Sequence, residues 1–363
     1  MKYKKVILIT GGCGFIGSRV VNHFVKKYPD YLIINYDALT YAGNLANVGK
    51  CNRFENYLFV KGDICNFEEL RSIFERYNVT DVIHLAAESH VDRSVSNPSL
   101  FAQTNVMGTL NLLNVAKEFW SVFPVYCDSH RFHHVSTDEV FGSLDMDMTK
   151  KFNENSPYNP HSPYSASKAS SDMFVRAYGD TYGMNITISN CSNNYGPNQF
   201  PEKLIPLVIN NLKNGKKIPI YGEGLNVRDW LYVDDHVNAI DMIFHNGKKG
   251  ETYCIGGDNE MTNIDVVKTI IDVYNQYRAT NIKFEDVVEH IVDPRGGGHD
   301  LRYAIDATKI KEELCWYPQE TFESGIWNTV NWYLANDEWL ENINNGEYKE
   351  YYNKFYKGLE DKK

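Results

Sequence analysis

The chain has 363 residues, of which 43% are hydrophobic and 23% charged, and its formal net charge is -10. This length and apolar content provide for one large or two coupled domains and exclude a disordered chain. The acidic balance argues against a nucleic-acid-binding protein, which usually presents a basic face, and no apolar run approaches the roughly 20 residues of a membrane span.

The seven cysteines are odd in number and include no CxxC pair. This pattern favours reduced thiols over a disulfide framework or a zinc site. We therefore expect a cytoplasmic protein with no bound metal.

The first predicted elements form a strand–helix–strand unit. KVILIT at 5–10 predicts a strand buried on both faces, because its apolar run is too short for a signal peptide. The glycines Gly11, Gly14 and Gly17 follow, then a helix pattern, then a second strand at 31–37. In this context the glycines indicate a turn where backbone N–H groups at a helix start bind a pyrophosphate. The alternative is an ordinary strand–helix turn.

Asp37 ends the second strand, twenty residues after Gly17. An acidic residue at this distance accepts hydrogen bonds from the adenosine ribose of a dinucleotide. A 2′-phosphate would be repelled there, so the sequence predicts NAD as the cofactor rather than NADP.

Further strands are predicted at 57–64, 81–89 and 131–137, separated by helices at 67–77 and 105–120. Alternating strands and helices predict an α/β fold, a Rossmann-type doubly wound parallel sheet. In such sheets ligands bind at the carboxyl ends of the strands. The residues expected at two of these ends are Asp63, Ile64, Leu85, Ala86, Ala87 and Ser89.

Thr137, Asp138 and Glu139 follow the third of these strands without a gap. We expect them to face the ligand crevice, since they too lie at a carboxyl end. Two crowded carboxylates do not both ionise easily, so one pKa rises and the pair supplies an acid and a base. The alternative is an exposed acidic loop.

Tyr164 and Lys168 lie four residues apart in a predicted helix that begins near Ser162 and Pro163. This spacing places both side chains on one face. A Lys ammonium beside the phenol would lower its pKa and make Tyr164 a general base toward an alcohol. The alternative is a surface pair.

The stretches TGGCGFIG, HLAAESHVDRS, STDEVFG and PYSASKASSD, in this order, resemble the extended short-chain dehydrogenase/reductases. More closely, the chain resembles the nucleoside-diphosphate-glucose 4,6-dehydratases, from about residue 4 to about residue 340. The resemblance implies NAD-dependent conversion of dTDP-glucose or UDP-glucose to a 4-keto-6-deoxy sugar, a step towards rhamnose and other deoxysugars.

The resemblance also implies residue roles. Tyr164, assisted by Lys168, would remove the C4 hydroxyl proton while Thr137 binds the C4 oxygen. Glu139 would remove the C5 proton, and protonated Asp138 would release the C6 hydroxyl as water.

Further positions match the family's binding sites. The cofactor side includes the glycines, the strand ends and the Tyr164–Lys168 pair. It also includes Phe15, Ile16, Thr40, Thr104 and Asn194. Those on the nucleotide-sugar side, with Ser89 and Thr137, are Asn193, Lys203, Leu204, Pro219, Tyr221, Arg228, Asn263, Arg295 and His299. Arg228 is the candidate for the diphosphate because its planar fork pairs with phosphate oxygens; the alternative is a salt bridge to Asp229 or Asp234.

Two segments depart from the family pattern. DPRGGGHD at 293–300 contains extra glycines around Arg295 and His299, and GPNQF has Asn198–Gln199 where many dTDP enzymes have an aromatic residue. The choice between thymine and uracil therefore stays open.

The domain division expected from the resemblance is interleaved. Residues 1–190, with returns near 226–255 and 300–310, would form the NAD-binding domain. Residues 191–225 and 256–363 would form the nucleotide-sugar-binding domain. The family also implies a homodimer that pairs helices 105–120 and 164–182 in a four-helix bundle; the alternative is that they pack only on their own sheet.

Three other functions stay open. A nucleotide-sugar 4-epimerase would share the glycines and the Tyr164–Lys168 pair without needing two carboxylates. A UDP-glucuronate decarboxylase would need a carboxylate-binding site. A non-catalytic NAD-binding scaffold would not need a tyrosine whose pKa is lowered by a neighbouring lysine.

Overall fold

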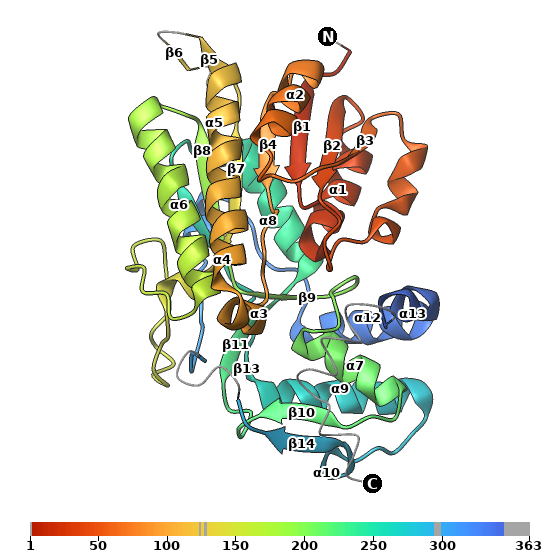
Figure 1. Ribbon diagram of the computed structural model, residues 1–363. Helices are drawn as coiled ribbons and strands as arrows, with labels where there is room; N and C mark the ends of the chain where they lie inside the picture. Colours follow the sequence, from red (N-terminus) through yellow and green to blue (C-terminus); the bar gives the residue numbers. More distant parts are fainter. Residues whose placement is uncertain (1, 123–124, 127–128, 294–298, 345–363) are drawn as a thin grey trace.

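The computed structural model describes residues 2–122, 125–126, 129–293 and 299–344. Figure 1 shows a large lobe, built around a sheet with helices on both sides, above a small lobe of helices and short strands. The chain crosses between the lobes more than once, because segments from both halves of the sequence contribute to each.

The large lobe contains a seven-stranded sheet in the order β12-β8-β7-β4-β1-β2-β3. Each neighbouring pair is parallel, so the predicted doubly wound parallel sheet is confirmed. The strands are β1 (Lys5–Thr10), β2 (Tyr31–Asp37), β3 (Tyr57–Lys61), β4 (Asp81–His84), β7 (Phe132–Thr137), β8 (Ile186–Cys191) and β12 (Thr252–Ile255).

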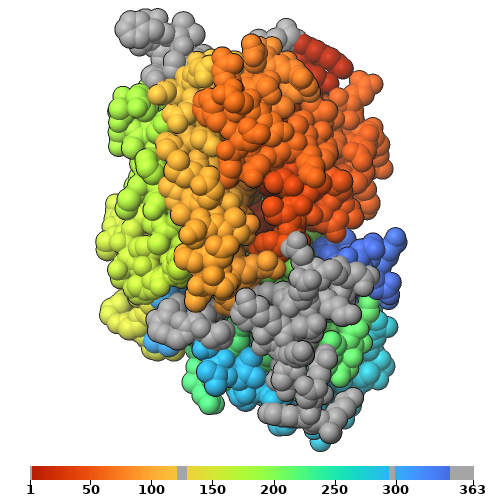
Figure 2. Space-filling view, in the orientation of Figure 1, coloured from red at the N-terminus to blue at the C-terminus, as the bar shows by residue number. Residues whose placement is uncertain are grey.

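Helices cover both faces of this sheet, because alternate residues of its strands point to opposite sides. In β1, Val6 and Leu8 pack with α2, α5 and α6, whereas Ile7 and Ile9 pack with α1 and α8. In the space-filling view, α5 (yellow-orange) and α6 (green) form the left side of the surface (Figure 2). The helices and helical turns of this lobe are α1 (Phe15–Lys27), η1 (Leu45–Asn47), η2 (Gly49–Arg53), α2 (Phe67–Tyr77), α3 (Val91–Ser96), α4 (Pro98–Phe101), η3 (Ala102–Gly108), α5 (Thr109–Trp120), η4 (Asp138–Phe141), α6 (Pro163–Tyr182), α8 (Val233–Asn246) and α11 (Thr308–Leu314).

Two predicted strands are shorter than expected. β3 ends at Lys61 rather than at residue 64, and β4 ends at His84 rather than at residue 89. The residues beyond these ends leave the ladder and line a cavity instead. The sequence pattern placed these residues correctly at the ligand-binding ends of the strands, but it made both strands too long.

The predicted helix at 105–120 begins as a π-helix, η3, before α5. Asn105 in η3 is buried; its side chain accepts a hydrogen bond from the backbone N–H of Glu88 at 2.8 Å and donates to Ser167 Oγ at 2.8 Å. Such π-segments occur frequently at functional sites.

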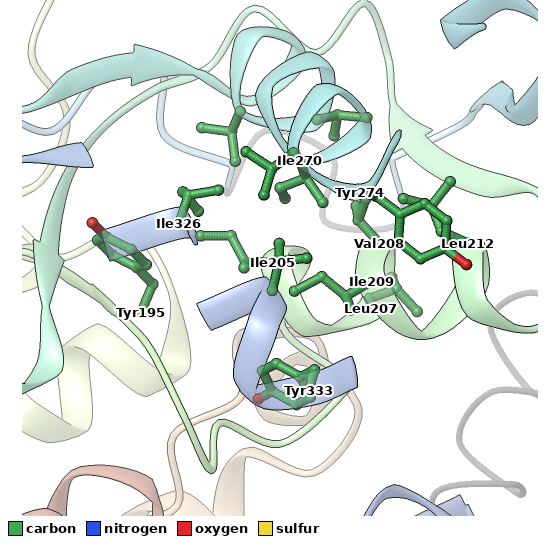
Figure 3. Close-up of a cluster of buried hydrophobic side chains, with 14 of the residues drawn as sticks. Tyr195, Ile205, Leu207, Val208, Ile209, Leu212, Ile270, Tyr274, Ile326 and Tyr333 are labelled. Atoms are coloured by element: carbon green, nitrogen blue, oxygen red, sulfur yellow. The ribbon is translucent and has the colours of Figure 1, made fainter. Parts of the chain in front are cut away.

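The small lobe has its own apolar core, drawn in part in Figure 3. Ile205 and Val208 from α7, Ile270 from α9 and Ile326 from α12 meet there. The elements of the small lobe and the short pieces between the lobes are β9 (Asn193–Tyr195), α7 (Leu204–Lys213), β10 (Ile218–Tyr221), β11 (Val227–Tyr232), β13 (Glu260–Thr262), α9 (Asn263–Arg278), α10 (Phe284–Val287), β14 (Val288–Ile291), α12 (Phe322–Ala335) and α13 (Asp337–Asn344). A separate two-stranded ribbon pairs β5 (Ser121–Val122) with β6 (Val125–Tyr126).

The chain returns to the large lobe after its first visit to the small one. β12 adds to the edge of the large sheet beside β8, and α8 packs on α1. The exact domain limits stay a prediction. Among the described residues, no helix combines the length and the apolar character needed to cross a membrane.

The core of the small lobe yields a stability prediction. Ile270 is fully buried, so we expect Ile270→Ala to lower the free energy of unfolding by about 2–5 kcal/mol through lost burial and a residual cavity. Urea unfolding followed by tryptophan fluorescence would measure this loss. Tyr277→Ala, at a position 44% exposed on the same helix, is the matched control and should change stability by about 0.5 kcal/mol or less. Equal effects of the two substitutions would contradict the assigned core.

Candidate active site

The end of β7 and the start of α6 place the predicted catalytic residues together. Thr137 closes β7, and its Oγ1 accepts a hydrogen bond from the Glu139 backbone N–H at 3.3 Å, which begins the turn η4. Ser162 and Ser165 form a capping box that fixes the start of α6, so Tyr164 lies in its first turn. All five predicted catalytic residues line one cavity of about 380 Å³.

The two neighbouring carboxyl groups occupy different environments. Asp138 is 1% exposed, its Oδ1 accepts a hydrogen bond from Thr137 Oγ1 at 3.3 Å, and its Oδ2 has no hydrogen-bond partner among the described residues. Burial, followed by the charge of Glu139, raises the pKa of Asp138 well above its usual value. Glu139 is only partly buried. This difference matches the predicted division into an acid and a base.

The predicted lowering of the Tyr164 pKa by Lys168 is wrong for this arrangement. Burial of the phenol, followed by the charge of Glu139, raises the pKa of Tyr164 well above its usual value. The Lys168 ammonium donates instead to the backbone carbonyl of Val135 at 2.9 Å. Burial also lowers the pKa of Lys168.

A polar seam joins α6 to β7 behind these residues; it consists of His134, Val135 and Ser136 on the strand and Lys168 and Asp172 on the helix. Asp172 is fully buried, accepts a hydrogen bond from Ser136 Oγ at 2.8 Å, and lies 3.1 Å from His134 Nε2. Burial alone would raise the pKa of Asp172, but the hydrogen bond from His134 and the Lys168 charge lower it overall. Burial, followed by the Lys168 charge, lowers the pKa of His134 to about 4. The seam therefore contains a carboxylate and a neutral imidazole.

All of the predicted cofactor residues line the same 380 Å³ cavity. They come from the loop after β1 and the first turn of α1, from the end of β2 and the loop after it, from the loops after β3 and β4, and from η3, α6 and β9. Those that the structure brings together are Gly11, Gly14, Phe15, Ile16, Gly17, Asp37, Thr40, Asp63, Ile64, Leu85, Ala86, Ala87, Ser89, Thr104, Tyr164, Lys168 and Asn194.

Two glycines of the turn after β1 lie where the neighbouring backbone leaves no room for a side chain. Gly11 has φ +71°, and a Cβ there would lie 2.7 Å from the Ala86 backbone nitrogen. A Cβ on Gly17 would lie 2.1 Å from the Gly11 carbonyl oxygen. Asp37 is held by the backbone N–H groups of Cys13 and Leu39, each at 2.8 Å, at the cavity wall. These residues would hold the pyrophosphate and the adenosine ribose.

A second cavity, of about 170 Å³, is lined by residues of both lobes and shares several of them with the first, among them Glu139 and Lys203. Four predicted substrate residues, Ser89, Thr137, Asn193 and Lys203, line the first cavity, and Asn193 and Lys203 line the second as well. Arg295 lies outside the described residues. The predicted substrate residues on the walls of the second cavity are Asn193, Lys203, Leu204, Pro219, Tyr221, Arg228, Asn263 and His299.

Arg228 is buried, with its guanidinium 4.3 Å from the centre of the Tyr303 ring. It donates to the backbone carbonyls of Val227 at 2.7 Å and Asp300 at 2.9 Å. Asp234, one partner considered for it, pairs with Arg19 at 2.5 Å. A fixed guanidinium on a cavity wall suits an anionic phosphate group.

Sequence reasoning missed several residues that line this cavity, among them His90, Glu202 and Tyr303. Glu202 is contacted by residues more than one hundred positions away in the chain, and such contacts leave no local pattern. Tyr303 lies in the stretch LRYAID, residues 301–306, where no spacing to another polar residue marks it as a site residue. No cluster of three or more His, Cys, Asp or Glu side chains suited to a metal ion occurs in the described ranges.

Comparisons with known proteins agree with this geometry. A family model described as GDP-mannose 4,6 dehydratase matches residues 8–329. The dTDP-glucose 4,6-dehydratase of Salmonella typhimurium is 51% identical over 360 residues, 97% of this chain and 99% of that protein. The Neisseria meningitidis dTDP-glucose 4,6-dehydratase is 49% identical over 348 residues, 94% of this chain and 97% of that protein.

Solved structures are also similar. The Bacillus anthracis dTDP-glucose 4,6-dehydratase in complex with NAD has a TM-score of 0.82 and 47% identity, covering 93% of this chain and 99% of that one. The Streptomyces venezuelae dTDP-glucose 4,6-dehydratase with NAD and TYD bound has a TM-score of 0.85 and 42% identity, with the same coverage. The resemblance inferred from the sequence motifs is confirmed: the chain belongs to the dTDP-glucose 4,6-dehydratase family.

Proposed function

We propose that the protein converts dTDP-glucose to its 4-keto-6-deoxy sugar by NAD-dependent dehydration, as a hydro-lyase of deoxysugar biosynthesis. The observation that carries this function is the position of Asp138 and Glu139 beside Tyr164 in the cavity that suits NAD. Sugar oxidation alone needs a tyrosine base, whereas the loss of water needs an acid and a base as well. The carboxyl pair therefore favours a dehydratase over a 4-epimerase.

The chain's own residues divide the proton transfers. When bound, NAD would take a hydride from C4 of the sugar and return it to C6, and its positively charged ring would favour a phenolate nearby. Tyr164 would remove the C4 hydroxyl proton while Thr137 orients the C4 oxygen. Lys168, held by Val135, would contact the ribose.

Elimination would follow at C5 and C6. The C4 ketone acidifies the C5 proton, and Glu139, the more exposed of the two carboxyl groups, would accept it and return a proton to C5 when the hydride returns to C6. Asp138, kept protonated by burial, would give its proton to the departing C6 hydroxyl. Arg228 would bind the diphosphate, and its hydrogen bonds to backbone carbonyls would fix the sugar's distance from Tyr164.

We also propose a cytoplasmic location, since the six cysteines among the described residues are unpaired. Thiols in this state suit a reducing compartment.

A substrate comparison tests the proposed function. We expect the purified protein to convert dTDP-glucose, with the product detected by alkaline absorbance and by the mass loss of one water. UDP-glucose should be converted roughly fourfold or more slowly, because a buried methyl group contributes about 0.8 kcal/mol. Absence of turnover with both sugars would overturn the assignment, and faster turnover of UDP-glucose would overturn the choice of base.

The carboxyl pair gives a second prediction. Asp138→Asn and Glu139→Gln should each lower the dehydration rate by about 10²–10⁴, the usual contribution of a positioned acid or base. The two differ in deuterium oxide: Asp138→Asn should still exchange the C5 proton through Glu139, whereas Glu139→Gln should not. Mass spectrometry of recovered sugar measures this exchange. Asp180→Asn, exposed on α6, is the control and should keep full activity.

Thermal unfolding without cofactor distinguishes a chemical role from misfolding. In the folded state Asp138 stays protonated above pH 3.8, its ordinary pKa, whereas in the unfolded chain it ionises there. Its burial therefore lowers the free energy of unfolding as the pH rises beyond that value. Asp138→Asn should therefore unfold at a higher temperature than the wild type at neutral pH, with the gap closing toward pH 3.8. A less stable Asp138→Asn at pH 7 would contradict the burial cost.

We propose a homodimer through α5 and α6. Apolar side chains on and beside α6 support this pairing: Val95, Leu100, Met107, Met173 and Phe174 are 37–57% exposed. We expect a sedimentation mass of twice the chain mass. Met173→Glu should shift it toward one chain, because a charge would be buried in an apolar interface. Met146→Glu, at a loop position 51% exposed, should leave it unchanged; a monomeric wild type would contradict the proposal.

A further inference from the structure

A short segment of the small lobe, residues 200–203, contacts two loops of the large lobe. The Phe200 ring lies edge-on to the Tyr41 ring, with centroids 5.6 Å apart. Lys203 Nζ donates to the backbone carbonyl of Ser89 at 3.0 Å. Glu202, between them, is 5% exposed. This one segment of the small lobe thus contacts both the loop after β2 and the loop after β4.

Glu202 is the polar centre of this contact. Its Oε1 accepts a hydrogen bond from Tyr41 OH at 3.0 Å, and its Oε2 accepts one from Arg93 Nε at 3.2 Å. The Arg93 guanidinium in turn lies 3.7 Å from the centre of the Tyr41 ring. A buried carboxylate with a donor on each oxygen is a strong and directional link.

Both loops held in this way form walls of the cofactor cavity. Thr40 and Ala42, on either side of Tyr41, line it. So does the stretch from Leu85 to Ser89, which leads into the helix that carries Arg93. Glu202 itself lines both the cofactor and the substrate cavities. A ligand in the first cavity therefore leaves more easily if these contacts open.

The proposed reaction gives a reason for such a link. The hydride taken from the sugar returns to the same sugar, so a cofactor that leaves in mid-cycle strands an oxidised intermediate. Ordinary packing between lobes would not need a buried ion pair, since removing a charged pair from water is costly.

We propose that Tyr41, Arg93, Phe200 and Glu202 form a clasp that retains NAD in its cavity through turnover. The clasp acts on the cofactor through the two loops, and its residues are positioning residues rather than catalytic ones. The proposal rests on the proposed function, because only a hydride that is borrowed and returned requires this retention.

Glu202→Gln tests the clasp with almost no change in shape. We expect purified Glu202→Gln to release NAD roughly tenfold faster than the wild type, the factor that corresponds to the loss of one charge-assisted hydrogen bond. Tyr41→Phe, which lacks a single hydroxyl, should release it a few-fold faster. NAD release is measured by desalting the loaded protein and following the bound cofactor with time, without sugar present.

The matched control is Glu118→Gln, which breaks an exposed pair to Arg71 Nε at 2.9 Å and should leave NAD release unchanged. During turnover without added NAD, Glu202→Gln should lose activity with time and regain it when NAD is supplied. Thermal unfolding checks that each variant is folded, and Tyr41→Phe decides the test if Glu202→Gln does not fold.

Wild-type release rates in both Glu202→Gln and Tyr41→Phe would overturn the clasp and leave the proposed function standing. If the wild type releases NAD slowly but converts no sugar, the proposed function is overturned. The effect of these residues on NAD retention can still be measured in that case. The two failures are therefore distinguishable.

Discussion

The polar seam between β7 and α6 is the contact on which the candidate site depends. Lys168 is held by the Val135 carbonyl, and Asp172 is held by Ser136. Since Thr137 follows Ser136 directly and Tyr164 lies one helical turn before Lys168, these bonds set the distance between the strand end and the phenol. Apolar packing alone would allow α6 to slide along the sheet, whereas buried hydrogen bonds have one satisfying register. The seam thus converts two separate elements into one rigid site.

The burial of Asp138 in this site lowers the stability of the folded protein. A carboxyl group with a buried, unpartnered oxygen destabilises the folded state by an amount comparable to a lost hydrogen bond. A protein selected for stability alone would expose or replace it. The proposed reaction gives a reason for such a group, because a buried carboxyl beside partly exposed Glu139 can serve as the acid of an elimination, which two equivalent exposed groups would not provide.

The sequence predicted the sheet, and it predicted that Thr137, Tyr164 and Lys168 lie together, because both predictions depend on local patterns. The apolar run KVILIT indicates a buried strand, and the other residues are defined by their positions along single elements. It missed features set by distant segments. The π-helix η3 arises where the Asn105 side chain bonds Glu88 and Ser167. The raised pKa of Tyr164 reflects burial by the whole fold. No spacing rule encodes such contacts, since each joins residues with no fixed separation.

The relative position of the two cavities follows from main-chain pairing. Thr137 pairs in register with Cys191 at the end of β8, and β9 begins at Asn193, after a single intervening residue. β9 then pairs with β11, which carries Arg228. Arg228 is therefore placed relative to Thr137 by strand hydrogen bonds rather than by a flexible linker. Because effective catalysis depends on sub-ångström placement of reacting atoms, an interleaved chain suits this chemistry better than two domains joined end to end.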